Sequence, residues 1–319
     1  MSDLFTSDAA CNAVAKRTVR EVAKHNLAPV DAVGELAAPI ATELRQRGKL
    51  PRNALPELFR NFLRRLADTP NIIDIEVGAF RTADLSVNES RMVRFVMVIS
   101  EFAGWLHCVT CEAKLSRRDL RLRFAGTEFR VSEHVLTRYM RREQKDLRHF
   151  FSGVTETLRA ACLIGPATLL SDSSATAVPF RDGLLLGDTH FIAEENFPKR
   201  YPVEICYDRN DGRRVVGELD LLVRGRVPLI EMRTFVDGQS LSPRKERLRD
   251  ILLDWRRKHR EGIDTFSSAM LFGSAPVRPN ADQKAMRQQS VEAIYAARDV
   301  VLSEAWQDYT AHRQAEERG

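Results

Sequence analysis

A histidine and two arginines recur at intervals of four residues in the segment 132–142. His134, Arg138 and Arg142 therefore share one side of a helix, because residues four apart lie on successive turns. An imidazole titrates near neutral pH and transfers protons, whereas a guanidinium stays charged and binds phosphate oxygens. This combination predicts attack on a phosphodiester, with His134 moving the proton. The same spacing is also typical of an ordinary solvated helix face.

The helical wheel of residues 132–143 separates apolar from charged side chains. At about 100° per residue, the apolar side carries Val135, Leu136, Tyr139 and Met140. The opposite side carries His134, Arg138, Arg141 and Arg142. Ser132 precedes the helix and is a favourable N-cap. We expect the apolar side to pack inward, so that the histidine and the arginines face either water or a cleft.

The pattern Ser-x-His-x-x-x-Arg-x-x-x-Arg, on a helix followed by strands, resembles a signature of small bacterial ribonuclease toxins of the barnase, EndoU, colicin and RelE type. The resemblance covers residues 132–236, and the alanine usual after the histidine is Val135 here. It implies metal-independent RNA cleavage in a toxin or defence setting. His134 would exchange protons with the 2′-hydroxyl or the 5′-oxygen, Arg138 and Arg142 would bind the phosphate, and Thr234 would donate to it from a later strand.

Positive charge is concentrated in two segments of a chain whose formal net charge is +5. Residues 114–148 carry eleven Lys/Arg against five Asp/Glu, and residues 241–260 carry eight against three. Such segments predict an anionic partner, with RNA expected over DNA. The alternative is that they are solvated helix faces. The predicted nucleic-acid ligands are Arg117, Arg118, Arg121, Arg141, Arg244, Lys245, Arg256 and Arg257.

A second block, residues 217–234, permits a rival enzyme. Asp220 on one strand, followed by Glu231-x-Arg233 on the next, is similar to the core of the PD-(D/E)xK nucleases. That resemblance implies a Mg²⁺ site at Asp220 and Glu231. The lysine that activates water in this family is Arg233 here, and a guanidinium is a poor base. The plain alternative is an amphipathic hairpin whose charged side chains pair across the strands.

The absence of several known motifs argues against other classes of enzyme. No phosphate-binding Gly-rich loop, nucleophile elbow or His-Glu-x-x-His zinc motif occurs, and the leading hypothesis needs no cofactor. Five irregularly spaced cysteines argue against a disulfide framework. Strand alternation places Cys108 and Cys111 on opposite faces, which predicts buried residues rather than zinc ligands.

Without an apolar run of about 18 residues or a secretory signal, we expect a cytoplasmic protein with no membrane partner.

The order of the predicted helices and strands indicates an α+β fold. In this fold a mainly antiparallel sheet is flanked by helices from both ends of the chain. A turn is expected at 125–127, where Ala-Gly-Thr follows an alternating strand. The other expected helices are 9–24, 29–46, 55–66, 132–143, 146–162, 243–260 and 280–315. The expected strands are 72–77, 92–99, 105–111, 120–124, 128–131, 176–180, 183–186, 202–207, 214–223 and 227–236.

This order divides the chain into four predicted regions: helical residues 1–68, a β-rich region 69–131, a helix-plus-sheet region 132–240 that carries the predicted catalytic or binding site, and basic C-terminal helices 241–319. The leading hypothesis is a metal-independent endoribonuclease acting through His134. The first alternative is the Mg²⁺-dependent nuclease. The second is a non-enzymatic adaptor that binds nucleic acid and assembles with a protein partner or a second copy of the chain.

Overall fold

The structure is a computed structural model of the 319-residue chain. The residues that it describes are 9–10, 13–14, 16–17, 29–69, 71–79, 91–101, 104–143, 147–169, 173–193, 203–208, 214–218, 226–272 and 283–318. Asp220 of the alternative metal site lies outside these residues, as does most of the helix predicted over 9–24.

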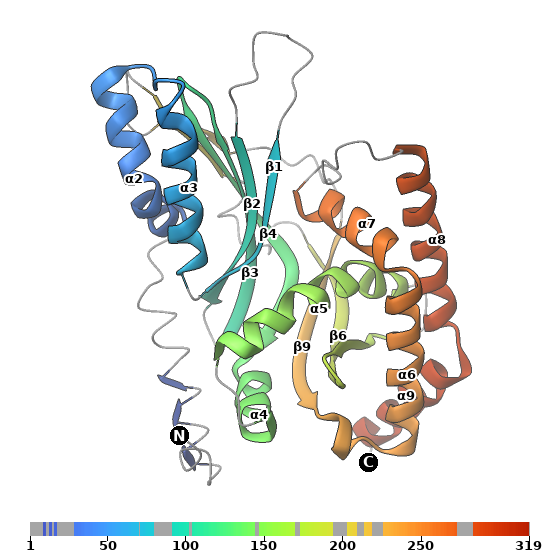
Figure 1. Cartoon of the computed structure of the whole chain (residues 1–319). Coiled ribbons are helices and arrows are strands. Elements are labelled where there is room, and N and C mark those ends of the chain that lie inside the picture. The colour runs from blue at the N-terminus through green and yellow to red at the C-terminus, as the bar shows by residue number, and fades with distance from the viewer. Residues whose placement is uncertain are drawn as a thin grey trace.

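One sheet of nine strands forms the centre of the molecule (Figure 1). Seven strands follow the order β1-β2-β3-β4-β9-β6-β5, while β7 pairs with β4, and β8 pairs with β7. Every pair is antiparallel except β4 and β9. The predicted α+β class is therefore confirmed. The strands are Ile72–Ala79 (β1), Arg91–Glu101 (β2), Trp105–Leu115 (β3), Leu120–Ser132 (β4), Ala175–Phe180 (β5), Gly183–Ala193 (β6), Val203–Tyr207 (β7), Arg214–Glu218 (β8) and Arg226–Val236 (β9).

β4 holds the sheet together because it has three partners. It pairs along its length with β3, while its other edge pairs first with β7 and then, from Phe129 to Val131, with β9. The turn predicted at 125–127 is wrong, since the chain continues as a strand and the irregularity becomes a bulge opposite His107 to Val109. The strands of residues 69–131 and 132–240 thus belong to one sheet.

Helices cover both faces of this sheet (Figure 1). α2 (Pro29–Arg47) and α3 (Ala54–Ala67) pack with β1 to β4 and β7 around one core. A larger core lies on the other side, beneath the remaining helices. These are α4 (Glu133–Glu143), α5 (Leu147–Thr168), α6 (Pro243–Lys258), α7 (Arg260–Phe272), α8 (Gln283–Val301) and α9 (Glu304–Arg318). A short 3-10 helix, η3 (Gly238–Ser240), connects β9 to α6.

Strand alternation assigns each apolar residue to one of the two cores. In β2, Phe95 packs in the α2–α3 core and Val96 in the larger core. In β3, Cys108 lies in the larger core and Cys111 in the α2–α3 core, so the prediction that these cysteines are buried on opposite faces is confirmed. The cysteines of the described residues, namely Cys108, Cys111, Cys162 and Cys206, are free thiols.

The helical predictions differ from the structure mainly near the C-terminus. The single helix predicted over 280–315 is wrong: α8 ends at Val301 and α9 begins at Glu304. Ser303 separates them, because its hydroxyl donates to the Val300 carbonyl (2.6 Å) and accepts from the Trp306 amide (3.4 Å). α7 was not predicted, and α5 extends to Thr168 beyond its predicted end. Among the described residues, no helix is long and apolar enough to cross a membrane.

Gly187 permits the close contact between β6 and β9. The register of this pair shifts between Leu186 and Gly187, and a Cβ atom on Gly187 would lie only 1.8 Å from the carbonyl oxygen of Glu231. Since this neighbour is backbone rather than a flexible side chain, it has little freedom to move aside.

We therefore expect Gly187→Ala to lower the free energy of unfolding by about 1–3 kcal/mol, because the added methyl group must force the two strands apart. Urea denaturation of the variant and the unchanged protein measures this difference. A loss below about 0.5 kcal/mol, the range of neutral surface substitutions, would contradict the tight approach of the two strands.

Candidate functional site

α4 has a buried apolar side and an exposed charged side, as the helical wheel predicts. The four apolar side chains, Val135, Leu136, Tyr139 and Met140, are buried. The histidine and the three arginines, His134, Arg138, Arg141 and Arg142, are exposed. Ser132 accepts a hydrogen bond from the Val135 amide at 3.4 Å, as expected of a residue that caps the helix. The predicted division of the helix into a core side and an outer side is confirmed.

Tyr139 fixes α4 against the sheet. Its ring packs edge-on against Phe150 of α5, Phe180 of β5 and Phe235 of β9, with centroid separations of 5.1, 5.4 and 5.3 Å. Burial raises the pKa of its hydroxyl to about 12, and that hydroxyl is hydrogen-bonded to the ring of His149. Aromatic contacts of this kind add to the free energy gained from burial alone.

Two polar contacts align α4 with the end of β9. At the start of the helix, Ser132 donates to the carbonyl of Arg233 at 3.0 Å. At the end of the helix, Arg142 donates to the Ser240 hydroxyl at 2.9 Å, and its Nε lies 3.5 Å from the carboxylate of Asp237. α4 therefore runs beside residues 233–240, and Arg142 is engaged within the protein.

The structure does not bring the side chains of Thr234 and Arg233, the residues predicted to join the site from β9, to the exposed side of α4. Phe235 faces α4, so the alternation of β9 turns the neighbouring Thr234 toward the opposite face. Arg233 makes ion pairs with Asp188 and Glu231, both at 3.1 Å. Because Arg142 is held by Ser240 and Asp237, the exposed α4 residues of the sequence-predicted site that these contacts do not involve are His134, Arg138 and Arg141.

His134 has an electrostatic environment that favours its neutral form. Partial burial and the neighbouring positive charge of Arg138 both lower the pKa of His134 below its usual value. A neutral imidazole accepts a proton, so at pH 7 this residue has the protonation state that a general base requires.

Glu231, a ligand of the alternative magnesium site, is bound by arginines. It lies on β9 opposite Arg130 of β4, with which it forms an ion pair, and Arg233 adds a second. His190 lies 3.9 Å away. Burial alone would raise the pKa of Glu231, but the hydrogen bond from Arg130 and the other cations outweigh it, and the pKa is lowered. Its side chain is 5 % exposed, and the described residues contain no group of three potential metal ligands.

The basic segment 114–148 does not form one surface. Arg117 and Arg118 lie at the turn between β3 and β4 and Arg121 lies at the start of β4, whereas Arg141 lies on α4. The thirteen residues of β4 separate these places by roughly 40 Å. Arg117 also donates to the Leu50 carbonyl at 2.8 Å, and Arg121 pairs with Asp119 at 2.9 Å, so both have structural contacts.

The predicted ligands of the second basic segment lie at the two ends of α6. Arg244 and the half-buried Lys245 are near its start, where Arg244 lies 3.9 Å from Asp308 of α9. Arg256 and Arg257 are near its end, where they pair with Glu156 (3.3 Å) and Asp254 (2.7 Å). Part of the positive charge is thus balanced within the protein.

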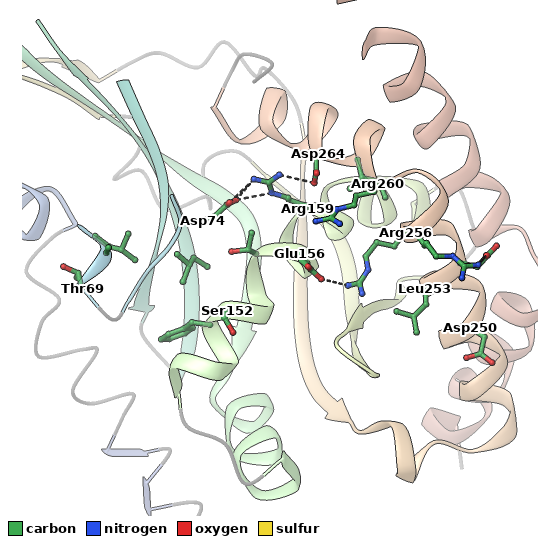
Figure 2. A pocket seen from close by; sticks show the side chains of 18 of the residues that line it. Thr69, Asp74, Ser152, Glu156, Arg159, Asp250, Leu253, Arg256, Arg260 and Asp264 are labelled. Carbon is green, nitrogen blue, oxygen red and sulfur yellow. Dashed lines mark hydrogen bonds and ion pairs between the residues drawn. The ribbon is translucent and has the colours of Figure 1, made fainter. Parts of the chain in front are cut away.

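A cavity of about 1290 Å³ with both polar and apolar lining residues lies between β1, α5, α6 and α7, and we call it the α5–α7 cavity (Figure 2). Arg256 and Arg257 are among its lining residues, together with residues that the sequence did not single out. The charged members are Asp68, Asp74, Glu156, Arg159, Asp250, Asp254, Arg256, Arg257, Arg260 and Asp264.

Arg159 forms the charged centre of this cavity. Its guanidinium lies 2.9 Å from Asp74 and 3.0 Å from Asp264 (Figure 2). It also pairs with Glu76. Burial opposes the positive charge, but the three carboxylates outweigh it and raise the pKa of Arg159. Burial raises the pKa of Asp74, because one guanidinium shared among three carboxylates compensates each only partly.

A strained backbone brings two of these carboxylates to the same place. Asp74 has a φ of 53°, which is uncommon for a residue with a side chain, although aspartate tolerates it better than most. The pairing of β1 with β2 is irregular between Ile73 and Glu76, so an extra residue interrupts the alternation. Asp74 and Glu76 can then both contact Arg159. The sequence showed Asp-x-Glu on a strand but gave no sign of its partners, which come from α5 and α7.

In comparisons with known proteins, no protein-family model, no curated protein and no solved structure matches the chain.

We expect Arg159→Met to destabilise the protein by about 3–5 kcal/mol at neutral pH, because it leaves three clustered carboxylates without their cation. The loss should shrink as the pH falls toward 4, since Asp74, whose pKa is raised, takes up a proton in the folded state at a higher pH than in the unfolded chain. Urea denaturation at several pH values measures both effects. Arg257→Met is the control, since its side chain is 80 % exposed and a change within about 0.5 kcal/mol is expected.

The pKa of Glu231 is shifted in the opposite direction to that of Asp74. Because its pKa is lowered in the folded state, its ion pairs stabilise the protein above the pKa of the unfolded chain and lose their effect as the pH falls through the folded pKa. Glu231→Gln should therefore be clearly less stable than the unchanged protein at pH 7, and the gap should narrow below pH 4. A gap that is the same at both pH values would contradict an ionised, arginine-bound Glu231.

Proposed function

We propose that the chain binds RNA through the outer side of α4 and cleaves it without a metal ion, with His134 as the proton-transfer group. The observation that supports this proposal is the position of α4. The helix is fixed at both ends beside residues 233–240, while His134, Arg138 and Arg141 stay exposed to a partner.

The proposed reaction uses the residue types of this side. A neutral His134 takes the proton of the ribose 2′-hydroxyl, and the 2′-oxygen then forms a bond to phosphorus. The bond from phosphorus to the 5′-oxygen breaks and that oxygen takes a proton from water, so the products are a 2′,3′-cyclic phosphate and a 5′-hydroxyl. The protonated His134 then returns its proton to the solvent. Arg138, one turn further along α4, binds the phosphate oxygens on which negative charge increases.

Two of the residues predicted with His134 receive different roles in this proposal. Arg142 holds the end of α4 through Ser240 and Asp237, and so positions the helix rather than the substrate. Thr234 faces away from α4 and has no part in the reaction. Arg141 is exposed on the same helix and provides a further contact to the RNA backbone.

The test is an incubation of the protein with single-stranded RNA in excess EDTA. We expect cleavage that yields 2′,3′-cyclic phosphate ends, a loss of at least about a hundredfold in rate for His134→Ala, in line with the usual contribution of general base catalysis, and no cleavage of DNA, which lacks the 2′-hydroxyl. His312→Ala is the matched control, because His312 is an exposed histidine on α9 and its removal should leave the rate unchanged.

The two alternatives give different results in the same assay. Cleavage that requires Mg²⁺ and continues in His134→Ala would reject the proposal in favour of the metal-dependent nuclease. Salt-dependent binding of RNA without cleavage, weakened by Arg138→Ala, would leave only the non-enzymatic binding protein. If neither RNA nor DNA binds, the α4 surface has some other role.

A further inference from the structure

The charges of the α5–α7 cavity are almost all paired within the protein. Arg159 is shared by Asp74 and Asp264, Arg256 pairs with Glu156, and Arg257 pairs with Asp254. Asp250 pairs with Arg249 of its own helix. Among the described residues, this leaves two lining charges without an ion pair, one acidic and one basic: Asp68 and Arg260.

These two charges come from different elements that line the cavity. Asp68 follows the last residue of α3, and Arg260 is the first residue of α7. Figure 2 shows Thr69, the chain neighbour of Asp68, on one side of the cavity and Arg260 on the other, with α5 between them. Both side chains are exposed and therefore available to a ligand.

The lining between them suits a neutral polar chain. Thr155 of α5 offers a hydroxyl group, whereas the Ser152 hydroxyl already donates to the His149 carbonyl at 2.9 Å and accepts from Arg181 at 2.7 Å. Leu253 of α6 adds partly exposed apolar surface. At about 1290 Å³, the cavity exceeds the roughly 300–1,000 Å³ typical of sites for drug-sized ligands. Its lining has six carboxylates against four guanidiniums, which disfavours a polyanion such as RNA.

We propose that the α5–α7 cavity binds a short peptide with free termini, whose ammonium group lies at Asp68 and whose carboxylate lies at Arg260. A peptide of this kind carries opposite charges at its two ends and a neutral hydrogen-bonding backbone between them, which matches the arrangement of the unpaired charges. The paired charges around Arg159 hold the cavity open and fix α5 and α7 relative to β1. This site is independent of the proposed RNA surface on α4.

Isothermal titration of the full chain with tri-, tetra- and penta-alanine tests the proposal, with the same peptides acetylated at the N-terminus or amidated at the C-terminus. We expect at least one peptide with free termini to bind, and either cap to raise its Kd by about tenfold or more, as expected for the loss of a charge-assisted contact. If no peptide binds, or if capped and free peptides bind equally, the proposal is overturned.

Two variants assign each terminus to its residue. In Arg260→Ala the C-terminal amide should no longer weaken binding, and in Asp68→Asn the N-terminal acetyl group should no longer do so. Arg298→Ala and Asp299→Asn, exposed charges on α8, are the matched controls and should preserve both effects. Persistence of both cap effects in Arg260→Ala and Asp68→Asn would also overturn the assignment. Since these side chains are exposed, circular dichroism should show all four variants folded.

Discussion

The parallel pairing of β4 with β9 is the contact on which the rest of the structure depends. It spans only Phe129 to Val131 on β4, yet it connects β9, β6 and β5 to the strands of the N-terminal half. The ion pair of Arg130 with Glu231 lies across this contact, and the ring of Trp105 covers Arg130 at 4.6 Å. Short parallel contacts provide few hydrogen bonds, so the partly buried ion pair of Arg130 and Glu231 and the packing of Trp105 on Arg130 add specificity to the pairing of β4 with β9.

Arginine serves repeatedly in this fold as a connection between elements. Arg94 of β2 is buried, pairs with Glu112 of β3 at 2.9 Å, and lies beneath the ring of Phe272 from α7. Arg159 connects α5 to β1 and α7 in the same manner. The basic composition of the chain therefore has a structural cause as well as a potential role in binding, because a planar guanidinium with five donors can satisfy several carboxylates at once.

The two candidate sites differ in charge and in construction. The α4 surface is a helix side with exposed cations, positioned by polar contacts at both of its ends. The α5–α7 cavity is a mixed-charge hollow with an excess of carboxylates, maintained by one shared guanidinium and a strained aspartate. A strained backbone such as that of Asp74 persists only where the surrounding structure holds it in place. Here Arg159, which pairs with both Asp74 and Asp264 of α7, holds it. These differences predict ligands of different chemistry.

The sequence by itself determined the local features. Helical periodicity identified α4 with its buried and exposed sides, strand alternation separated Cys108 from Cys111, and the succession of strands and helices gave the α+β class. These features depend on neighbouring residues, so their spacing is visible in the chain. Contacts between distant segments leave no such periodic signal. Only the tertiary structure showed that β4 continues through the expected turn, that Thr234 faces away from α4, and that Arg159 gathers carboxylates from segments 85 and 105 residues away.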